Sequence, residues 1–429
     1  MVGGLRPAGT LDDVPASAVP AATDVLVVGA GPAGSAAAAW AARAGHDVVL
    51  ADAAVFPRDK TCGDGLTPRA IAELNLLGLG DWVRGHARNR GLRAAGFGRE
   101  WQLPWPGGAF PDHGSAVPRM ALDARIREVA LKDGVTPLDG ARAVDVERDG
   151  DRITAVVFET ADDERFRVAC RRLVVADGVR SPLGRVLGRE WHRETAYGVA
   201  ARGYVRSGRS DDEWISSHLE LRGEDGELLS GYGWVFPLGA AAGEVNIGVG
   251  TLATARRPAG VQLKALLETY TDARRDEWQI DGGVRAPASA LLPMGGAVSG
   301  VAGRNWALIG DAAGCVNPLN GEGIDYGLET GRLVVDLFGE PDWSGAWPAT
   351  LRTHYGEAFS IARRLAGLLT LPRFLPAAGP VGMRSRGLMT VALRVMGNLV
   401  TDADRDLVAR AWRTAGRLSV RMDQRTPFS

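Results

Sequence analysis

The strongest constraint on the fold lies near the start of the chain, where an apolar run at 25–28 leads into the segment GAGPAG at 29–34. The run has the composition of a buried parallel strand, and the alanine-rich residues 32–44 predict a helix that Gly45 ends. In this order of elements the first glycine permits a tight turn, the second admits a pyrophosphate close to the backbone, and the third lets helix pack on strand. The sequence therefore predicts a βαβ unit that holds a dinucleotide at the helix N-terminus.

The second strand of this unit ends at Asp52, about 20 residues beyond the glycines. A carboxylate at this position accepts hydrogen bonds from both ribose hydroxyls and repels a 2′-phosphate. A tight turn without a ligand is the alternative interpretation, and the strand, the helix and the acid together favour the dinucleotide. The pattern alone does not distinguish NAD from FAD.

Two later segments decide between these cofactors. ADGVRSPLGR at 176–185 and LIGDAAGCVNPLNGEGID at 308–325 resemble FAD-dependent oxidoreductases of the para-hydroxybenzoate hydroxylase type. The resemblance implies that Asp311 contacts the ribityl chain, that Arg119 reaches the phosphates and that Val144 lies near the adenine. It also implies a helix whose N-terminus, near 321–324, faces the flavin pyrimidine, where its partial positive charge stabilises the reduced flavin. An ordinary strand end at Asp311 and a surface position for Arg119 are the alternatives.

FAD is thus the expected cofactor. The residues expected to bind it are Gly29, Gly31, Pro32, Ala33, Gly34, Asp52, Ala53, Arg58, Cys62, Gly63, Asp64, Arg119, Val144, Ala176, Asp177, Gly178, Gly310, Asp311, Pro318, Gly321, Glu322, Gly323 and Ile324. No metal site is expected, because the three cysteines are too widely spaced for a Cys-x-x-Cys pair or an iron–sulfur cluster.

The order of elements predicts an α/β fold: a Rossmann-type FAD-binding domain of the para-hydroxybenzoate hydroxylase type, a β-rich substrate domain and a C-terminal helical region. Alternating runs around Asp149 and Gly150 predict a hairpin. The expected boundaries are a disordered leader at 1–23, a discontinuous FAD-binding domain at 24–80, 118–194 and 299–340, a substrate-binding domain at 81–117 and 195–298, and a helical, membrane-contacting region at 341–429.

The segment CGDGLTPRA at 62–70 and the strand GYGWVFPLG at 231–239 resemble the geranylgeranyl reductase family, and in particular its actinobacterial menaquinone reductases. Those enzymes saturate one isoprene double bond of the menaquinone tail, at the β unit counted from the ring. The resemblance implies the same substrate and reaction here, and it places Cys62 beside the isoalloxazine. Cys62 and Asp64 are the predicted catalytic residues.

Alternation along 231–237 puts Tyr232, Trp234 and Phe236 on one face of a strand. An isoprenoid quinone has a flat ring and a long apolar tail, so a slot with aromatic walls suits it, and these three residues are expected to bind substrate. Packing against a neighbouring layer is the alternative. Reduction of an isolated alkene requires a hydride on one carbon and a proton on the other. No proton donor is evident from the sequence, and Cys62, Tyr232 and Asp64 are the candidates.

The expected partners follow from charge and from missing motifs. GGAVSGVAG at 295–303 lacks an acid at the distance that a second nucleotide site requires, so either NAD(P)H visits transiently or a reducing protein supplies electrons. A net charge of −1 argues against a nucleic-acid partner.

A membrane surface is also an expected partner. Residues 358–401 contain no acidic residue and interleave arginines with leucines, which suits an anionic membrane surface, although a helical cap with solvated arginines is the alternative. The arginines are Arg363, Arg364, Arg373, Arg384, Arg386 and Arg394. With no signal peptide expected at 1–23 and no apolar run of about 18 residues, the predicted location is cytoplasmic, peripherally attached to the inner face of the cell membrane.

Other functions are compatible with parts of the sequence. Flavin monooxygenases and halogenases share the FAD segments, but halogenases carry a Trp-x-Trp-x-Ile-Pro strand where this chain has Tyr232 and Phe236. A prenyl-chain binding protein without flavin chemistry is the alternative outside enzymes, and the intact flavin segments argue against it. The expected function is FAD-dependent reduction of a menaquinone side chain.

Overall fold

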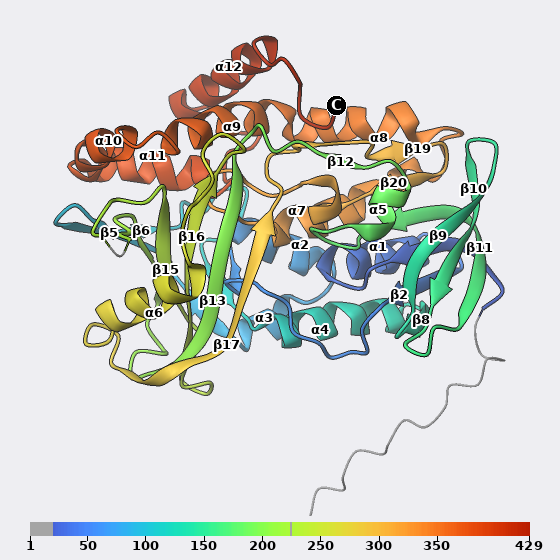
Figure 1. Cartoon of the computed structure of the whole chain (residues 1–429), viewed down its shortest axis with the longest axis horizontal. Helices are drawn as coiled ribbons and strands as arrows, with labels where there is room; N and C mark the ends of the chain where they lie inside the picture. The colour runs from blue at the N-terminus through green and yellow to red at the C-terminus, as the bar shows by residue number, and fades with distance from the viewer. Residues whose placement is uncertain (1–19, 224) are drawn as a thin grey trace, which may run out of the picture.

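The computed structural model describes residues 20–223 and 225–429, in which two large sheets lie side by side under a layer of C-terminal helices (Figure 1). The first sheet has the order β19-β20-β11-β1-β2-β8, and β10 and β9 extend it from β11. Its strands are β1 (Ala22–Val28), β2 (Val48–Asp52), β8 (Thr136–Asp139), β9 (Arg142–Asp149), β10 (Arg152–Glu159), β11 (Arg165–Val175), β19 (Ala302–Gly303) and β20 (Trp306–Leu308).

The start of β1 and the β9–β10 hairpin test two expectations from the sequence, the end of the leader and the hairpin around Asp149. β1 begins at Ala22, so the last two residues of the expected leader, 22 and 23, belong to a strand. Residues 1–19 of that leader lie outside the described residues. The expected hairpin is confirmed, since β9 and β10 pair antiparallel with Asp149 opposite Arg152.

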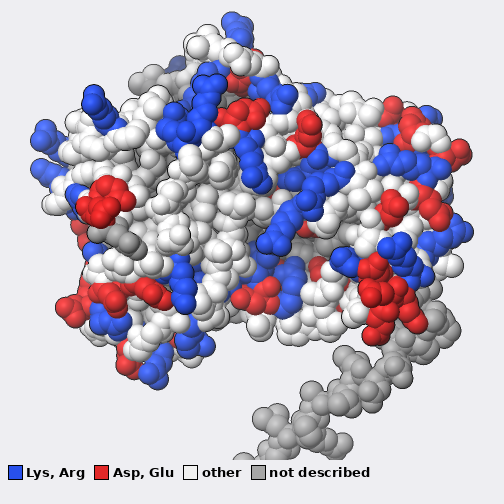
Figure 2. Space-filling model, in the orientation of Figure 1, with Lys and Arg blue, Asp and Glu red and all other residues white. Residues whose placement is uncertain are grey.

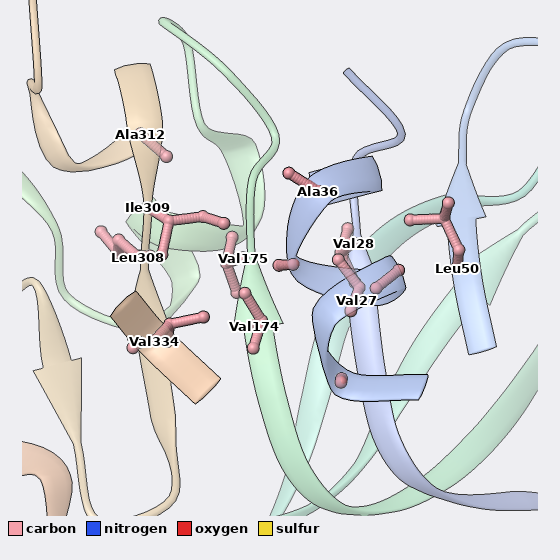
Figure 3. Close-up of a cluster of buried hydrophobic side chains, with 14 of the residues drawn as sticks. Val27, Val28, Ala36, Leu50, Val174, Val175, Leu308, Ile309, Ala312 and Val334 are labelled. Carbon is pink, nitrogen blue, oxygen red and sulfur yellow. The ribbon is translucent and has the colours of Figure 1, made fainter. Parts of the chain in front are cut away.

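The centre of the first sheet is parallel and buried. β1 lies between β2 and β11, with Val28 opposite Ala51 on one side and Val175 on the other. Strands covered on both faces carry continuous apolar sequences, as these do. Figure 3 shows side chains of the parallel strands, such as Val27 and Val174, gathered in this core with Ala36.

Helices α1 (Pro32–Arg43), α4 (Arg119–Lys132) and α7 (Ile324–Leu333) pack together, with α1 contacting both of the others. A Cβ added to Gly34 would lie 1.8 Å from the carbonyl oxygen of Gly29. Only glycine permits this approach, so the third glycine of the turn has the packing role predicted for it.

The second sheet is built mainly from the middle of the chain, in the order β17-β13-β16-β15-β14-β5-β6. Its strands are β5 (Gly91–Gly96), β6 (Arg99–Pro104), β13 (Tyr197–Ser207), β14 (Trp214–His218), β15 (Gly231–Pro237), β16 (Glu244–Ala253) and β17 (Ile280–Leu292). The parallel pairing of β5 with β14 brings residues 91–104 into this sheet. The α/β fold class is confirmed, while the exact division into domains stays a prediction.

Helices make up most of the C-terminal part, as expected. They are α8 (Trp343–Leu351), α9 (Glu357–Leu369), α10 (Phe374–Met383), α11 (Arg386–Met396) and α12 (Leu407–Arg421). The other strands and α-helices are β3 (Gly65–Leu66), β4 (Ala87–Asn89), β7 (Gly114–Ala116), β12 (Glu190–Trp191), β18 (Val298–Ser299), α2 (Pro68–Leu76), α3 (Gly80–Arg84), α5 (Pro182–Val186) and α6 (Leu263–Ala273). Within the described residues, no helix combines the length and apolar character needed to cross a bilayer.

Candidate active site

The glycine turn between β1 and α1 opens toward two guanidinium groups. A Cβ added to Gly31 would lie 3.5 Å from Arg58 Nη2 and 4.0 Å from Arg119 Nη2. The free N–H groups at the start of α1 border the same space. Two cations and a helix N-terminus around a bare backbone fit the pyrophosphate of a dinucleotide.

Arg119 is buried, which excludes the surface position considered for it. Its Nε and Nη2 donate to the two oxygens of Asp123 at 2.6 and 2.7 Å, and Arg58 Nη1 donates to the same carboxylate at 3.0 Å. Burial opposes the charge of Arg119, but Asp123 raises the pKa of the guanidinium above its ordinary value. Asp123 was not predicted as a site residue, although its position four residues after Arg119 on one helix was a usable signal.

Asp52 stands at the rim of the same space. Its Oδ2 accepts a hydrogen bond of 2.7 Å from the Ala30 amide, and its Oδ1 accepts one of 2.9 Å from the Ala54 amide. These two bonds fix the carboxylate beside the glycine turn. Arg58 Nη2 lies 3.9 Å from the same group.

The two later FAD segments meet the glycine turn directly. A Cβ added to Gly29 would lie 2.3 Å from the carbonyl oxygen of Ala176, and one added to Gly310 would lie 2.9 Å from Ala33 Cβ. Gly29 (φ +102°) and Gly310 (φ +55°) also adopt left-handed conformations. Asp311 lies beside the start of α7, since a Cβ at Gly323 would lie 3.0 Å from its Oδ1.

All these segments line one end of a cavity of about 790 Å³. The predicted site residues that line it are Gly29, Gly31, Pro32, Ala33, Asp52, Ala53, Arg58, Cys62, Gly63, Arg119, Ala176, Asp177, Gly178, Tyr232, Trp234, Phe236, Gly310, Asp311, Pro318, Gly321, Glu322, Gly323 and Ile324. Gly34, Asp64 and Val144 do not line it. The preceding residues Ala141, Arg142 and Ala143 line the cavity beside Val144.

The aromatic residues of β15 share one face, as the alternation predicted. The ring centroids of Tyr232 and Trp234 are 6.0 Å apart, and those of Trp234 and Phe236 are 6.2 Å apart. All three line the cavity. The Tyr232 hydroxyl donates to the carbonyl oxygen of Asn320, which ties this wall to the loop before α7.

The loop that carries Cys62 lies against this aromatic wall. A Cβ on Gly63 would lie 3.2 Å from Trp234 Nε1, and one on Gly65 would lie 2.9 Å from Phe236 Cε2, so both positions need small residues. Cys62 itself is partly buried and lines the cavity. Burial raises the pKa of its thiol, which therefore stays neutral near pH 7.

Asp64 is fully buried behind this loop and points away from the cavity lining. Its Oδ2 accepts from the Tyr204 hydroxyl at 2.7 Å and from Asn246 Nδ2 at 2.8 Å, and its Oδ1 accepts from the Arg119 amide at 3.2 Å. Burial raises the pKa of Asp64 to about 6 against the effect of these hydrogen bonds. Any contribution of Asp64 to catalysis therefore acts through the residues that it holds.

Asn246 connects the aromatic wall to the cysteine loop. Its Oδ1 accepts from Trp234 Nε1 at 2.9 Å, and its Nδ2 donates to the carbonyl oxygen of Cys62 at 3.0 Å as well as to Asp64. The sequence interpretation missed Asn246 and Tyr204. A lone asparagine in the apolar strand EVNIGVG was a signal for Asn246, because a buried amide requires partners.

The far end of the cavity is apolar and is formed by other parts of the chain. β5, β6 and the residue that follows β6 contribute three of the side chains named below, and the C-terminal helices contribute the others. These residues are Leu92, Leu103, Trp105, Leu369, Phe374, Leu375, Met383, Met389, Leu393 and Met396. The cavity thus runs from the nucleotide-binding turn, past the aromatic wall, to an end that is lined by apolar side chains.

Comparison with known proteins agrees with this geometry. Residues 22–216 match the family model described as an FAD binding domain, so the dinucleotide is FAD, as the later segments predicted. The menaquinone reductase of Mycobacterium tuberculosis (strain CDC 1551 / Oshkosh) is 64% identical over 95% of this chain and 98% of its own length. Digeranylgeranylglycerophospholipid reductase 1 of Methanopyrus kandleri is 30% identical over 81% of this chain and 90% of its own.

A solved structure shows the same fold. The geranylgeranyl bacteriochlorophyll reductase-like protein of Thermoplasma acidophilum superposes with a TM-score of 0.68, covering 94% of this chain and 98% of that one, at 19% identity. This chain therefore belongs to the geranylgeranyl reductase family of FAD-dependent oxidoreductases, together with the mycobacterial menaquinone reductases.

Proposed function

We propose that this protein is an FAD-dependent reductase that saturates one isoprene double bond of the menaquinone side chain, at the β unit counted from the ring. The lining of the cavity carries the proposal: FAD-binding segments and Cys62 lie at one end, three aromatic rings lie along one wall, and apolar side chains lie at the other end. A flat quinone ring with a polyprenyl tail is the ligand that matches this order of surfaces. The high identity to menaquinone reductases supports the same substrate.

The residues of the chain supply binding, orientation and exclusion of water. Arg58, Arg119 and the start of α1 hold the pyrophosphate of FAD, which when reduced supplies the hydride that the alkene needs. The rings of β15 orient the tail near the quinone. The apolar residues at the far end exclude water from the double bond. This exclusion is required because an isolated alkene has no polar group to which the protein could donate a hydrogen bond.

Mass spectrometry of quinones tests the proposal. Reduced enzyme is added to fully unsaturated menaquinone, and a gain of two hydrogens in the tail is expected. Addition of oxygen or halogen would instead indicate a monooxygenase or halogenase, functions that no relative described above favours. A tail that gains nothing would refute reduction.

We also propose that electrons reach FAD from transiently bound NAD(P)H or from a reducing protein. In support, none of the described segments other than β1–α1–β2 combines a glycine turn with an acid at the spacing that a second nucleotide requires. Anaerobic mixing with NADH or NADPH distinguishes the two donors, because only a nicotinamide donor bleaches the flavin absorbance without an added protein.

We further propose that α10 and α11 rest on the inner face of the cell membrane in the cytoplasm. Aliphatic side chains are exposed on these helices, with Val381 at 58% and Leu388 at 54%. Arg373, Arg384 and Arg386 are exposed beside them and have no carboxylate partner within the described residues. Because α10 and α11 also wall the far end of the cavity, this placement lets a tail enter from the bilayer.

The other arginines of this stretch have structural roles that the sequence pattern did not reveal. Arg363 is buried, Arg364 Nη2 lies 2.8 Å from Asp423, and Arg394 lies 2.8 Å from Asp406. In Figure 2 the edge that α10 and α11 occupy in Figure 1 carries blue and white atoms. The proposed contact therefore rests on three arginines and not on six.

Sedimentation with phosphatidylglycerol vesicles tests the membrane proposal. Each arginine near an anionic surface contributes about 1 kcal/mol, so changing Arg373, Arg384 and Arg386 to glutamate should weaken binding by at least about 100-fold. The control changes three exposed arginines of β11, at the far end of the molecule from α10 (Figure 1), to glutamate: Arg165, Arg167 and Arg171. Equal loss of binding in both variants would refute this membrane-contact surface.

A further inference from the structure

The proposed reduction requires a proton donor beside the double bond, and this inference rests on that proposed function. Of the candidates from the sequence, Asp64 does not line the cavity, and the Tyr232 hydroxyl already donates to a carbonyl oxygen. Cys62 lines the cavity, but burial raises the pKa of its thiol, which makes it a weaker acid than an ordinary cysteine. Another acid on the cavity wall meets the requirement better.

Glu322 lines the cavity next to the aromatic wall. Its Oε1 accepts a hydrogen bond from Thr67 Oγ1 at 2.5 Å, and its own amide donates to Asn320 Oδ1 at 2.9 Å. Asn320 is the residue whose carbonyl oxygen receives the Tyr232 hydroxyl. These contacts fix the Glu322 carboxyl beside the rings expected to hold the substrate.

The other carboxylates of the cavity are committed to partners of their own. Asp52 accepts two backbone amides, Asp59 forms an ion pair with Arg202 at 2.7 Å, and Asp177 accepts from the Leu183 amide at 2.9 Å. Asp311 lies at the start of α7, on the side where FAD is held. Glu322, which the sequence placed among the FAD-binding residues, is therefore the carboxyl of the cavity that lies beside the aromatic wall without a cation of its own.

A second carboxyl, that of Asp325, lies three residues after Glu322, in the first turn of α7. Asp325 is fully buried, its Oδ1 has no hydrogen-bond partner among the described residues, and its Oδ2 receives only a 3.4 Å contact from Asn398. The nearby Arg69 is engaged by Glu329 at 2.7 Å. Glu329 also lies 3.9 Å from Arg332, so the nearby cations serve Glu329 first, and neither Glu322 nor Asp325 has an ion-pair partner among the described residues. Burying two such carboxylates is unfavourable unless protons are retained.

The pKa values of Glu322 and Asp325 are shifted in the direction that this excess of buried negative charge requires. Burial and the neighbouring Asp325 raise the pKa of Glu322 well above its ordinary value. Burial likewise raises the pKa of Asp325 to about 7, with Arg69 acting in the opposite direction. A proton is therefore available on this pair near pH 7, next to the cavity.

We propose that Glu322 is the catalytic acid that protonates the double bond. Its O–H bond breaks and the electron pair of the alkene forms a new C–H bond with that proton, while the other carbon accepts the hydride that reduced FAD supplies. The result is a saturated isoprene unit, oxidised FAD and a Glu322 carboxylate. Asp325 is the positioning residue that keeps Glu322 protonated between turnovers.

The experiment compares the holoenzyme with Glu322→Gln and with the control Glu268→Gln, an exposed glutamate on α6. Infrared spectroscopy at pH 7 should show a protonated carboxyl band that Glu322→Gln removes or weakens and Glu268→Gln leaves intact. FAD content should be unchanged. Single-turnover reduction of menaquinone by the prereduced enzyme should fall by at least about 100-fold in Glu322→Gln only.

The outcomes separate this inference from the proposed function. If wild-type enzyme reduces the tail and Glu322→Gln does so within threefold of the same rate, the inference is wrong and the function stands. An unchanged infrared band, or loss of FAD from the variant, also overturns it. If wild-type enzyme leaves the tail unsaturated, the proposed function fails and the proton-donor role fails with it.

Discussion

Replacement of Asn246 by alanine should loosen the loop that carries Cys62. Asn246 is fully buried and joins Trp234, Cys62 and Asp64 through three hydrogen bonds of 2.8 to 3.0 Å. The variant leaves an indole N–H, a carbonyl oxygen and a carboxylate oxygen without this partner. Each unsatisfied buried group costs about 1–3 kcal/mol. Asp64 keeps the hydrogen bond from the Tyr204 hydroxyl, so the expected loss of stabilisation of the loop is about 3 kcal/mol. At about 1.4 kcal/mol per factor of ten, the loop should open roughly 100-fold more often.

The reactivity of Cys62 toward a maleimide measures this opening, because Cys170 and Cys315 are buried elsewhere. The labelling rate should rise by about 100-fold in Asn246→Ala. Asn305→Ala is the matched control: Asn305 is also buried and makes three hydrogen bonds, but to residues 153 and 171 in the first sheet. A rate within threefold of wild type in Asn246→Ala, or an equal rise in Asn305→Ala, would refute the argument that Asn246 holds the loop.

Three further predictions concern the same site. The pKa of Asp64 is raised from 3.8 to about 6. The stability that this shift contributes is fully present below pH 4 and is lost as the pH rises through 6. By pH 7 the loss in the free energy of unfolding amounts to about 3 kcal/mol. Urea unfolding of Asp64→Asn should accordingly show a flatter dependence on pH between 4 and 7 than wild type, and an unchanged slope would contradict the assignment. Arg58→Ala should weaken FAD binding at least about tenfold in a fluorescence titration, with less effect at high salt, because a charge-assisted contact to phosphate is lost. Trp234→Ala should lower tail reduction at least about tenfold while FAD content is unchanged; loss of FAD would mean that the strand is only scaffold.

Much of the nucleotide site was predictable because its signals are local. The glycine turn, the strand before it, the helix after it and Asp52 lie within a short stretch, so spacing alone fixes their arrangement. The aromatic face of β15 was predictable for the same reason, since alternation along one strand determines which side chains share a face. These features needed no knowledge of distant contacts.

The parts that could not be predicted depend on long-range pairing or on exact register. The parallel pairing of β5 with β14 joins residues more than a hundred positions apart and leaves no local trace. The lining of the cavity at the start of β9 is formed by Ala141, Arg142 and Ala143, and the placement of Val144 near the adenine stays a prediction. The arginines of 358–401 formed an even pattern in sequence, yet acids at 404–406 and 423, outside the stretch, engage some of them.

The cavity is built from two sets of elements that differ in how closely their backbones pack. The FAD end is fixed by close backbone approaches, such as the 1.8 Å that a Cβ at Gly34 would leave to Gly29, so almost no substitution is tolerated there. The far end is formed by side chains of the β5–β6 hairpin and of α10, which meet through a hydrogen bond of 2.8 Å from Trp101 Nε1 to the carbonyl oxygen of Met383. Side chains at this end can change in size while the FAD end stays intact, because none of them touches the glycine turn. We therefore expect substitutions in the hairpin and in the C-terminal helices to change which substrate is accepted while leaving FAD binding intact.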